Sequence, residues 1–365
     1  MGLKLNMNAM NQIVKGVPIW EENETITSVC LVLKGRILVQ REGMQTILGT
    51  GNFLGICDLY SGSSSVTYTA YDNAVIYPFS VRSPGDIETI IHKNKEYGGL
   101  MVASLSRYIR ELRGIVEELS NEARDLCIFL QDYYERYQIQ AKKVDFNVPE
   151  LKELSVMEDY EMSELLDMRK AEYYSECAGV PIEVQKEFYQ NETICVYHIE
   201  EQTELARQLI LECTEIYQFL KATAKKLYDK GEYCLFKQVA RCIITLNAKN
   251  KNPDKELIDS IDRMVEKLNT LDLLLEKKTG RTLDIDRDEL ENLYYMILSG
   301  EVPEEIATSV KEKVVMLHDS MDKIFQAGSF TGEKKEAFLQ LFSQYKSMVD
   351  KNAVDDASRR LRKEL

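Results

Sequence analysis

The sequence predicts an α+β protein with a small β-roll at the N-terminus, a long helix after it, and an all-α remainder. Three patterns favour this fold class. At least six short β-like runs lie within the first eighty residues, separated by turns that contain Gly, Asn or Asp. Apolar residues then recur in a strict heptad over nearly five repeats. Amphipathic helical patterns with Gly or Pro near their ends follow for the rest of the 365 residues.

A Gly- and Ser-rich stretch, Gly49–Ala70, lies at the centre of the N-terminal β-like runs. The run Ser28–Arg41 precedes it, and the run Tyr71–Phe79 follows it. Glycines at this density suit tight turns and close backbone approach, as in loops that hold a phosphate. No Lys or Arg occurs between Arg41 and Arg82, so the stretch has the composition of a phosphate-binding loop without its positive charges.

Several motifs occur in a fixed order around this stretch. They are the Lys34-Gly35 strand turn, the glycines of Gly51–Phe53 and Gly55, and the pattern of Ala70, Asp72 and Asn73 at the far end. In this order they resemble the cyclic nucleotide-binding domain family, which includes the catabolite activator proteins and the regulatory subunits of cyclic-nucleotide kinases. The resemblance covers Gly16–Glu118 and implies a β-jelly roll that carries a phosphate-binding cassette.

Two departures from the family pattern predict that this cassette is degenerate. The resemblance implies a Glu after the second glycine to hold the ribose hydroxyl, but this position is Ile56. It also implies an Arg that pairs with the cyclic phosphate, and the matching position is Ser64, give or take one residue. A charged Arg–phosphate bond contributes about 1.5–3 kcal/mol, so losing both contacts lowers the affinity by roughly two to four decades. The candidate ligand-binding residues are Gly55, Ile56, Cys57, Ser63, Ser64 and Ser65.

We expect this cassette to be a structural relic. A different, less charged ligand and a true cyclic nucleotide are the two alternatives.

The stretch Lys95–Tyr137 predicts one long helix, because its apolar residues follow alternating steps of three and four. β-branched residues at a positions with Leu at d positions are typical of parallel two-stranded coiled coils, so we expect a homodimer. The expected dimer interface is formed by Leu105, Ile109, Leu112, Val116, Leu119 and Leu126. The alternative is that the same helix face packs against its own domain.

The predicted domains are the β-roll at 1–94, the connecting and dimerisation helix at 95–144, and a helical bundle or irregular solenoid at 145–365. The last boundary rests on a break in the helical pattern before Pro149. The helices expected after it are Glu150–Cys177, Gln185–Glu201, Glu204–Tyr228, Tyr233–Ala248, Asp254–Lys278, Asp286–Leu298, Pro303–Phe325, Gly332–Asp350 and Asp355–Leu365. The final residues, RRLRKEL, lack a C-cap signal, as expected of a chain that continues further.

The negative charge is concentrated in one segment. The net charge is −14, and residues 145–220 carry eighteen Asp or Glu against five Lys or Arg. Eleven of the twenty Tyr lie between residues 133 and 233. We expect protein partners to bind this acidic helical region, and the alternative is an ordinary solvated helix face. An acidic segment of this kind argues against DNA as a partner.

The sequence contains no pattern that predicts catalysis or metal binding. Its three histidines, His92, His198 and His318, are far apart and lack HxxxH or HExxH spacing. The acidic stretch Leu283–Glu291 has Glu289 where a calcium-binding loop requires Gly. No GxSxG, Walker A or GxGxxG motif occurs. We therefore expect no enzyme activity, no cofactor and no metal ion.

Eight cysteines without a CxxC pair predict a reduced, cytoplasmic protein, and no apolar run is long enough to predict a membrane partner. The sequence thus indicates a non-catalytic intracellular signalling or scaffolding protein with a degenerate cyclic nucleotide-binding domain. The alternatives are a transcription regulator of the catabolite activator type and a sensor of a different small ligand. The regulator would need a basic winged helix-turn-helix after the long helix, where this chain has its acidic segment.

Overall fold

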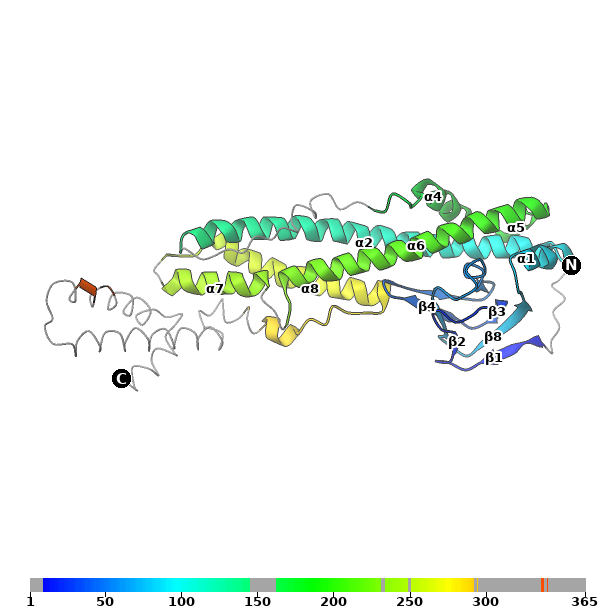
Figure 1. Ribbon diagram of the computed structural model, residues 1–365, viewed down its shortest axis with the longest axis horizontal. Helices are drawn as coiled ribbons and strands as arrows, with labels where there is room; N and C mark the ends of the chain where they lie inside the picture. Colours follow the sequence, from blue (N-terminus) through cyan, green and yellow to red (C-terminus); the bar gives the residue numbers. More distant parts are fainter. Residues whose placement is uncertain are drawn as a thin grey trace. The chain divides into compact units, whose positions relative to one another are not determined.

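The computed structural model describes residues 9–144, 162–230, 234–248 and 251–291, together with residues 294, 336, 337 and 340. The described part is a β-roll followed by long helices, which confirms the predicted α+β class (Figure 1). The chain divides into two compact units. Unit 1 is Met1–Asp125, Asp159–Lys221 and Leu273–Thr282, and unit 2 is Leu126–Glu158, Ala222–Asp272 and Leu283–Leu365. The predicted segments 1–94, 95–144 and 145–365 follow the order of the elements, whereas each unit combines stretches that are far apart in sequence.

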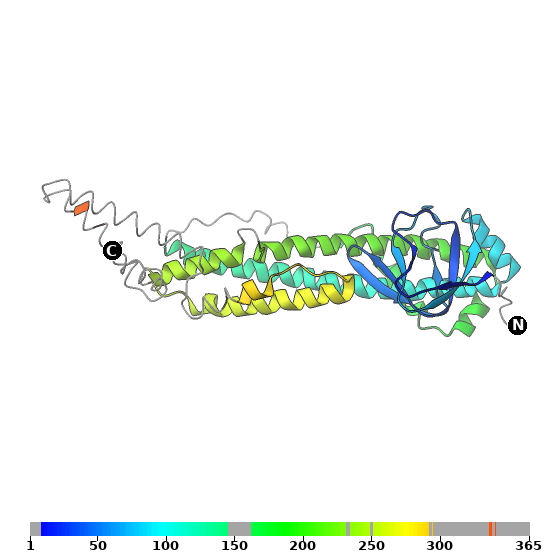
Figure 2. The same ribbon diagram turned by 90° about the horizontal axis from the view of Figure 1, so that it is seen from below.

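The roll consists of two four-stranded antiparallel sheets within unit 1 (Figure 2). One sheet has the strand order β1-β8-β3-β6 and the other β2-β7-β4-β5. The strands are β1 (Asn11–Ile13), β2 (Pro18–Trp20), β3 (Ser28–Lys34), β4 (Ile37–Arg41), β5 (Met44–Leu48), β6 (Phe53–Leu54), β7 (Thr67–Ala70) and β8 (Ala74–Ser80). Neighbours such as β3 and β8 are distant in sequence, so the loops that join the strands cross between the sheets.

The burial pattern shows how the roll is covered. In β4, Ile37 and Val39 are buried while Leu38 between them is partly exposed, as in a sheet with one buried face. In β3, by contrast, the four residues Val29–Val32 are all buried. A strand of this kind has a cover on both faces. The long helix that follows the roll contacts this sheet at β6, where the Ser104 hydroxyl accepts a hydrogen bond of 2.8 Å from the backbone N–H of Phe53.

Seven helices are described after the roll. They are α1 (Gly85–Lys93), α2 (Glu96–Lys142), α4 (Met168–Cys177), α5 (Ile182–Phe188), α6 (Glu192–Leu227), α7 (Leu235–Ala248) and α8 (Lys255–Thr279). The predicted long helix is confirmed as α2, and it extends beyond the expected end at Tyr137. Of the expected helix Asp286–Leu298, residues 286–291 and 294 are described. The expected helices Pro303–Phe325 and Asp355–Leu365, and all of Gly332–Asp350 except residues 336, 337 and 340, lie outside the described residues.

One predicted helix break is wrong. The sequence pattern placed a boundary between Glu201 and Glu204, but α6 continues without interruption through this region. The two residues between these expected helices, Gln202 and Thr203, are both buried. Gln202 Nε2 donates a hydrogen bond of 2.7 Å to Ser106 Oγ of α2, so these residues are part of a helix–helix interface.

The apolar stripe of α2 is already covered within a single chain. The six residues predicted to form a dimer interface are at most 3% exposed: Leu105, Ile109, Leu112, Val116, Leu119 and Leu126. In unit 1 the helix packs on the roll through Ser104 and on α6 through Ser106. The structure therefore describes the packing that was named above as the alternative to a coiled coil. A homodimer through these residues stays an untested prediction, and it would require the chain to expose them first.

In unit 2 the second half of α2 packs with α7 and the start of α8. Arg136 forms an ion pair with Glu256. Gln140 Nε2 donates to Asp254 Oδ2 over 3.1 Å. Tyr133 of α2 is fully buried. All strands of the described residues lie in unit 1, so the contacts of this unit come from helices and the segments that join them.

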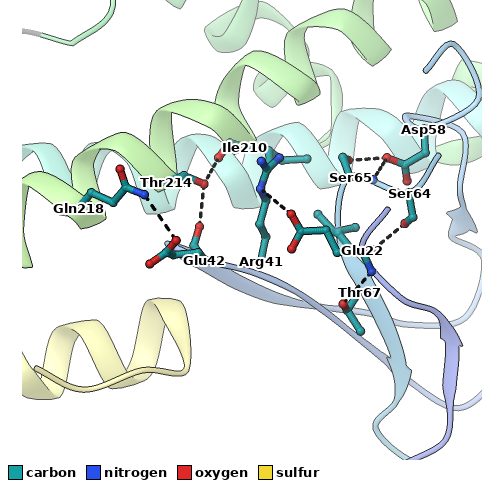
Figure 3. Close-up of polar contacts among 11 residues, drawn as sticks. Glu22, Arg41, Glu42, Asp58, Ser64, Ser65, Thr67, Ile210, Thr214 and Gln218 are labelled. Atoms are coloured by element: carbon teal, nitrogen blue, oxygen red, sulfur yellow. Dashed lines mark hydrogen bonds and ion pairs between the residues drawn. The ribbon is translucent and has the colours of Figure 1, made fainter. Parts of the chain in front are cut away.

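The hairpin between β4 and β5 is docked directly on α6 in unit 1 (Figure 3). The Thr214 hydroxyl donates to the Glu42 carbonyl oxygen over 2.7 Å, and Gln218 Nε2 donates to the Glu42 carboxylate over 3.4 Å. Gly43 has φ +90°, and a Cβ there would lie 2.5 Å from the Cys213 carbonyl oxygen. Only glycine combines this backbone conformation with this close approach.

We predict that Gly43→Ala lowers the free energy of unfolding by about 2–4 kcal/mol, because a left-handed φ is combined with a clash against a helix backbone. Urea unfolding followed by circular dichroism measures the change. Gly51→Ala is the matched control, because Gly51 has φ +84° but open space around its Cα. It should cost only about 1–2 kcal/mol. Equal losses in the two variants would show that the hairpin does not depend on α6.

Candidate functional site

The candidate site is the loop between β6 and β7, which corresponds to the predicted cassette. Gly55 opens the loop with φ +79°, a conformation that favours glycine. Ile56 and Cys57 follow, and their side chains are 1% and 4% exposed. Ile56 thus belongs to the core of the roll. At the position where the resemblance implies a ribose-binding carboxylate, the structure places an apolar side chain out of reach of solvent.

A buried carboxylate, Asp58, holds the loop together (Figure 3). Asp58 has no exposed surface. Its Oδ1 accepts a hydrogen bond of 2.7 Å from the backbone N–H of Ser65 and a second, very short one from the Ser65 hydroxyl. Its Oδ2 accepts a bond of 3.0 Å from the Tyr68 hydroxyl. These three donors satisfy the carboxylate from within the chain, as a buried charge requires.

The serines of the loop are likewise engaged inside the roll. Ser64 is 1% exposed, and its hydroxyl donates to the Val66 carbonyl oxygen. Its backbone N–H donates to the Glu24 carbonyl oxygen over 2.8 Å, and its own carbonyl oxygen accepts from Asn23 over 2.7 Å. Ser63 forms a β-bridge with Thr25. Ser63 and Ser64, which would face an anion in a phosphate-binding cassette, are therefore paired with residues 23–25, just before β3.

The electrostatics of the loop are unfavourable for an anion. Burial raises the pKa of Asp58, and the hydrogen bonds from Ser65 and Tyr68 and the charge of Arg207 oppose that rise. Burial, followed by the charge of Asp58, also raises the pKa values of Cys57 and Tyr68 well above their usual range. A phosphate placed here would meet the like charge of the carboxylate and would compete with it for the Ser65 donors.

Two arginines of unit 1, Arg207 and Arg41, have acidic neighbours. Arg207 of α6 lies 3.8 Å from Glu204, measured between Nη1 and Oε2. Arg41 of β4 lies 3.6 Å from Glu22, measured between Nε and Oε1. Both pairs are partly exposed, so each contributes little to stability. They place negative charge beside the cations that a phosphate would need.

The structure brings all six predicted cassette residues into one loop. Ile56, Cys57 and Ser64 are buried, and Ser63 and Ser65 are partly exposed. Sequence reasoning missed Asp58 and its partner Tyr68. A signal was available, because Asp58 is the only charged residue in the Gly49–Ala70 stretch. Among the described residues, no three His, Cys, Asp or Glu side chains gather in a way that could hold a metal ion.

Comparison with known proteins bears on the fold of the N-terminal part. No family model and no curated protein matches the chain. Solved structures do match, among them the catabolite activator protein of Thermus thermophilus. That match has 15% identity and a TM-score of 0.28, and it covers 55% of this chain and 89% of the other. The N-terminal part of this chain resembles cyclic nucleotide-binding domains.

Two further structures are similar over a shorter stretch of this chain. One is the N-terminal domain of a transcriptional regulator from Streptomyces coelicolor A3(2), with 16% identity and a TM-score of 0.21, which covers 29% of this chain and 76% of the other. The other is the PKAR CBD2 domain bound to Sp-2Cl-cAMPS, with 19% identity and a TM-score of 0.20, which covers 24% of this chain and 64% of the other.

In the described residues, no helix is both long and apolar enough to span a bilayer.

We predict that Asp58→Ala lowers the free energy of unfolding by about 1–3 kcal/mol, because Ser65 and Tyr68 lose their buried acceptor. Asp58→Asn should cost less, since it keeps an acceptor oxygen. The single tryptophan, Trp20, reports on the site by fluorescence because its ring lies edge-on to Tyr68 at 5.6 Å. Equal losses in both variants would show that a neutral acceptor of the same shape does not replace the carboxylate, so that the negative charge of Asp58 sets its role.

The raised pKa of Asp58 predicts that the stabilities of the wild type and of Asp58→Asn depend differently on pH. Because the pKa of Asp58 is raised in the folded state, folded protein binds more protons than unfolded protein as the pH rises from 3.8. The contribution of this group to stability therefore falls with rising pH in that window. We expect the stability of the wild type to fall relative to that of Asp58→Asn as the pH rises toward neutral. A constant difference between the two proteins across this range would contradict a raised pKa.

Proposed function

We propose that this chain is a non-catalytic signalling or scaffolding protein, in which a roll of the cyclic nucleotide-binding type acts as a structural module and not as a nucleotide sensor. One observation carries the proposal. The Asp58 carboxylate is buried inside the cassette and takes the backbone and hydroxyl donors of Ser65. Because the Asp58 carboxylate accepts from both Ser65 donors, these donors are hydrogen-bonded without a bound ligand.

The packing of the roll supports a structural role. Its β4–β5 hairpin contacts α6 through Glu42 and Thr214. Its β6 strand contacts α2 through Phe53 and Ser104. Asn52, next to β6, accepts a hydrogen bond of 3.1 Å from Arg107 Nε of α2. The roll thus holds two long helices, α2 and α6, by backbone and side-chain contacts.

We expect no tight binding of cyclic AMP or cyclic GMP to the full chain. Ile56 and Ser64 replace the two contacts that the resemblance implies, and Asp58 adds like-charge repulsion. Isothermal titration calorimetry with each nucleotide is the measurement, and Asp58→Asn is the control for repulsion alone. That variant should stay without tight binding, because it restores neither lost contact. A dissociation constant of about 10 μM or tighter for the wild type, roughly −7 kcal/mol, would overturn the proposal in favour of a nucleotide sensor.

We also expect no sequence-specific binding to duplex DNA. The excess of thirteen negative charges over residues 145–220 opposes association with phosphates. Fluorescence anisotropy of labelled duplexes from a random pool, at physiological salt, measures it. Enrichment of one sequence with a strong salt dependence would instead favour the transcription-regulator alternative.

A further inference from the structure

An exposed apolar surface lies on α4, α5 and the first turns of α6, all within unit 1. Fifteen large apolar side chains are exposed in the described residues, and six of them fall between residues 173 and 197. They are 39–62% exposed, and we call them the α5 surface: Tyr173, Val180, Val184, Phe188, Ile194 and Tyr197. Such clustering is the usual mark of a binding surface, whereas single exposed apolar residues are ordinary.

Helix α5 presents its apolar side outward. Val184 and Phe188 are spaced by four residues, which places them along one side of the helix, and Val180 lies just before its start. The opposite side carries the buried Gln185, whose Nε2 donates to the Cys177 and Val180 carbonyl oxygens over 3.0 and 2.8 Å. A polar residue thus anchors this helix while its apolar residues face solvent. This is the reverse of the amphipathic pattern of a helix whose only role is structural.

The aromatic part of the surface is held in place by a hydrogen-bonded carboxylate. Glu201 of α6 accepts a bond of 2.8 Å from the Tyr197 hydroxyl and one of 2.9 Å from the Tyr174 hydroxyl of α4, which lies beside α6 in Figure 1. Lys170 pairs with the same carboxylate over 3.2 Å. His198 packs edge-on against the rings of Tyr174 and Tyr197. Aromatic rings fixed in this way lose little entropy on binding, which suits them to anchor a partner.

Acidic side chains surround these apolar groups. Between residues 168 and 201 the chain has seven Glu against three Lys or Arg. Four of these glutamates are exposed on α4 and α5: Glu172, Glu176, Glu183 and Glu187. Because of this negative charge, the α5 surface would repel a second copy of itself and would also repel an anionic membrane. It complements a partner that is apolar on one side and positively charged around it.

We infer that the α5 surface binds a basic amphipathic helix of a protein partner. The inference rests on the proposed scaffolding function and specifies the chemistry of the partner. The apolar side of the partner helix would cover Val184 and Phe188, and its Lys and Arg residues would pair with Glu183 and Glu187. Arg side chains would also stack on the exposed ring of Tyr197.

The test uses the full chain and three labelled peptides of about 18 residues, roughly five helical turns. The first is a Leu/Lys peptide with helical amphipathic spacing. The second has Glu in place of Lys, and the third is a scrambled Leu/Lys peptide of the same composition. We expect fluorescence anisotropy to show binding of the first peptide alone, with an affinity that falls as salt is added. Equal binding of the first and the scrambled peptide, or no binding of either, would overturn the inference.

Two sets of variants locate the binding site. Val184→Ser combined with Phe188→Ser should weaken binding of the Leu/Lys peptide by about tenfold or more. The matched control is Leu211→Ser, which removes another exposed apolar residue of α6 outside the surface and should change the affinity by less than about twofold. Glu183→Lys with Glu187→Lys should weaken binding at low salt, whereas Glu111→Lys, an exposed site on α2, should not. Circular dichroism confirms that each variant is folded.

The outcomes separate this inference from the function on which it rests. If the α5-surface variants bind the Leu/Lys peptide as the wild type does, the partner surface is misplaced, whatever the nucleotide titrations show. Sedimentation compares the wild type with the variant that combines Val184→Ser and Phe188→Ser. If the wild type is a dimer and the variant is a monomer, the α5 surface binds a second copy of the chain and the inference is wrong. Tight nucleotide binding would overturn the structural role of the cassette without altering the peptide result.

Discussion

The architecture of unit 1 depends on the burial of α2 from two sides. On one side the Ser104 hydroxyl accepts from the backbone of Phe53 in the roll, and on the other Ser106 accepts from Gln202 of α6. These two serines are both buried, so small polar residues sit at both close contacts of an otherwise apolar stripe. Gly98 at the start of α2 follows the same logic, because a Cβ there would lie 2.5 Å from Cys195 Sγ of α6. A helix that is apolar on more than one side is stable only when such contacts cover it.

The cassette follows from the same preference for internal contacts. In the loop between β6 and β7, residues 55–59 and Ser64 are buried and have little access to water. Polar groups there must find partners inside the protein. Asp58, Ser65 and Tyr68 satisfy one another, and Ser64 bonds to the segment around Glu24. The result is a loop with the backbone turns of a binding site and the hydrogen bonding of a core.

The acidic helices around α5 differ from the cassette because they expose apolar side chains to water. Around α5 the Gln185 amide nitrogen and the Glu201 carboxylate form hydrogen bonds within the chain, but the apolar side chains beside them are left in water. Leaving these groups exposed forgoes the free energy that burial would gain, about 25 cal/mol for each Å² of apolar surface. A surface of this composition is stable in the free protein because glutamates surround it and keep it soluble. Folding leaves the apolar groups of the α5 surface exposed, so they can be buried only when a partner binds.

The sequence by itself determined the fold class, the order of strands and helices, and the absence of positive charge in the cassette. Those features are local: turn glycines, the alternation in β4, and the heptad of α2 act over a few residues. Tertiary structure decided which side of each pattern is covered. The α2 stripe reads equally well as a dimer seam or as a core face, and only the neighbouring roll and α6 distinguish them. Gln202 lies between two helices expected from the sequence, and in the structure it lies inside the single helix α6, where it bonds to Ser106 of α2. Asp58 acquires its role from Ser65 and Tyr68 across the loop. A side chain's partner is set by the packing of distant segments, and no periodicity along the chain encodes it.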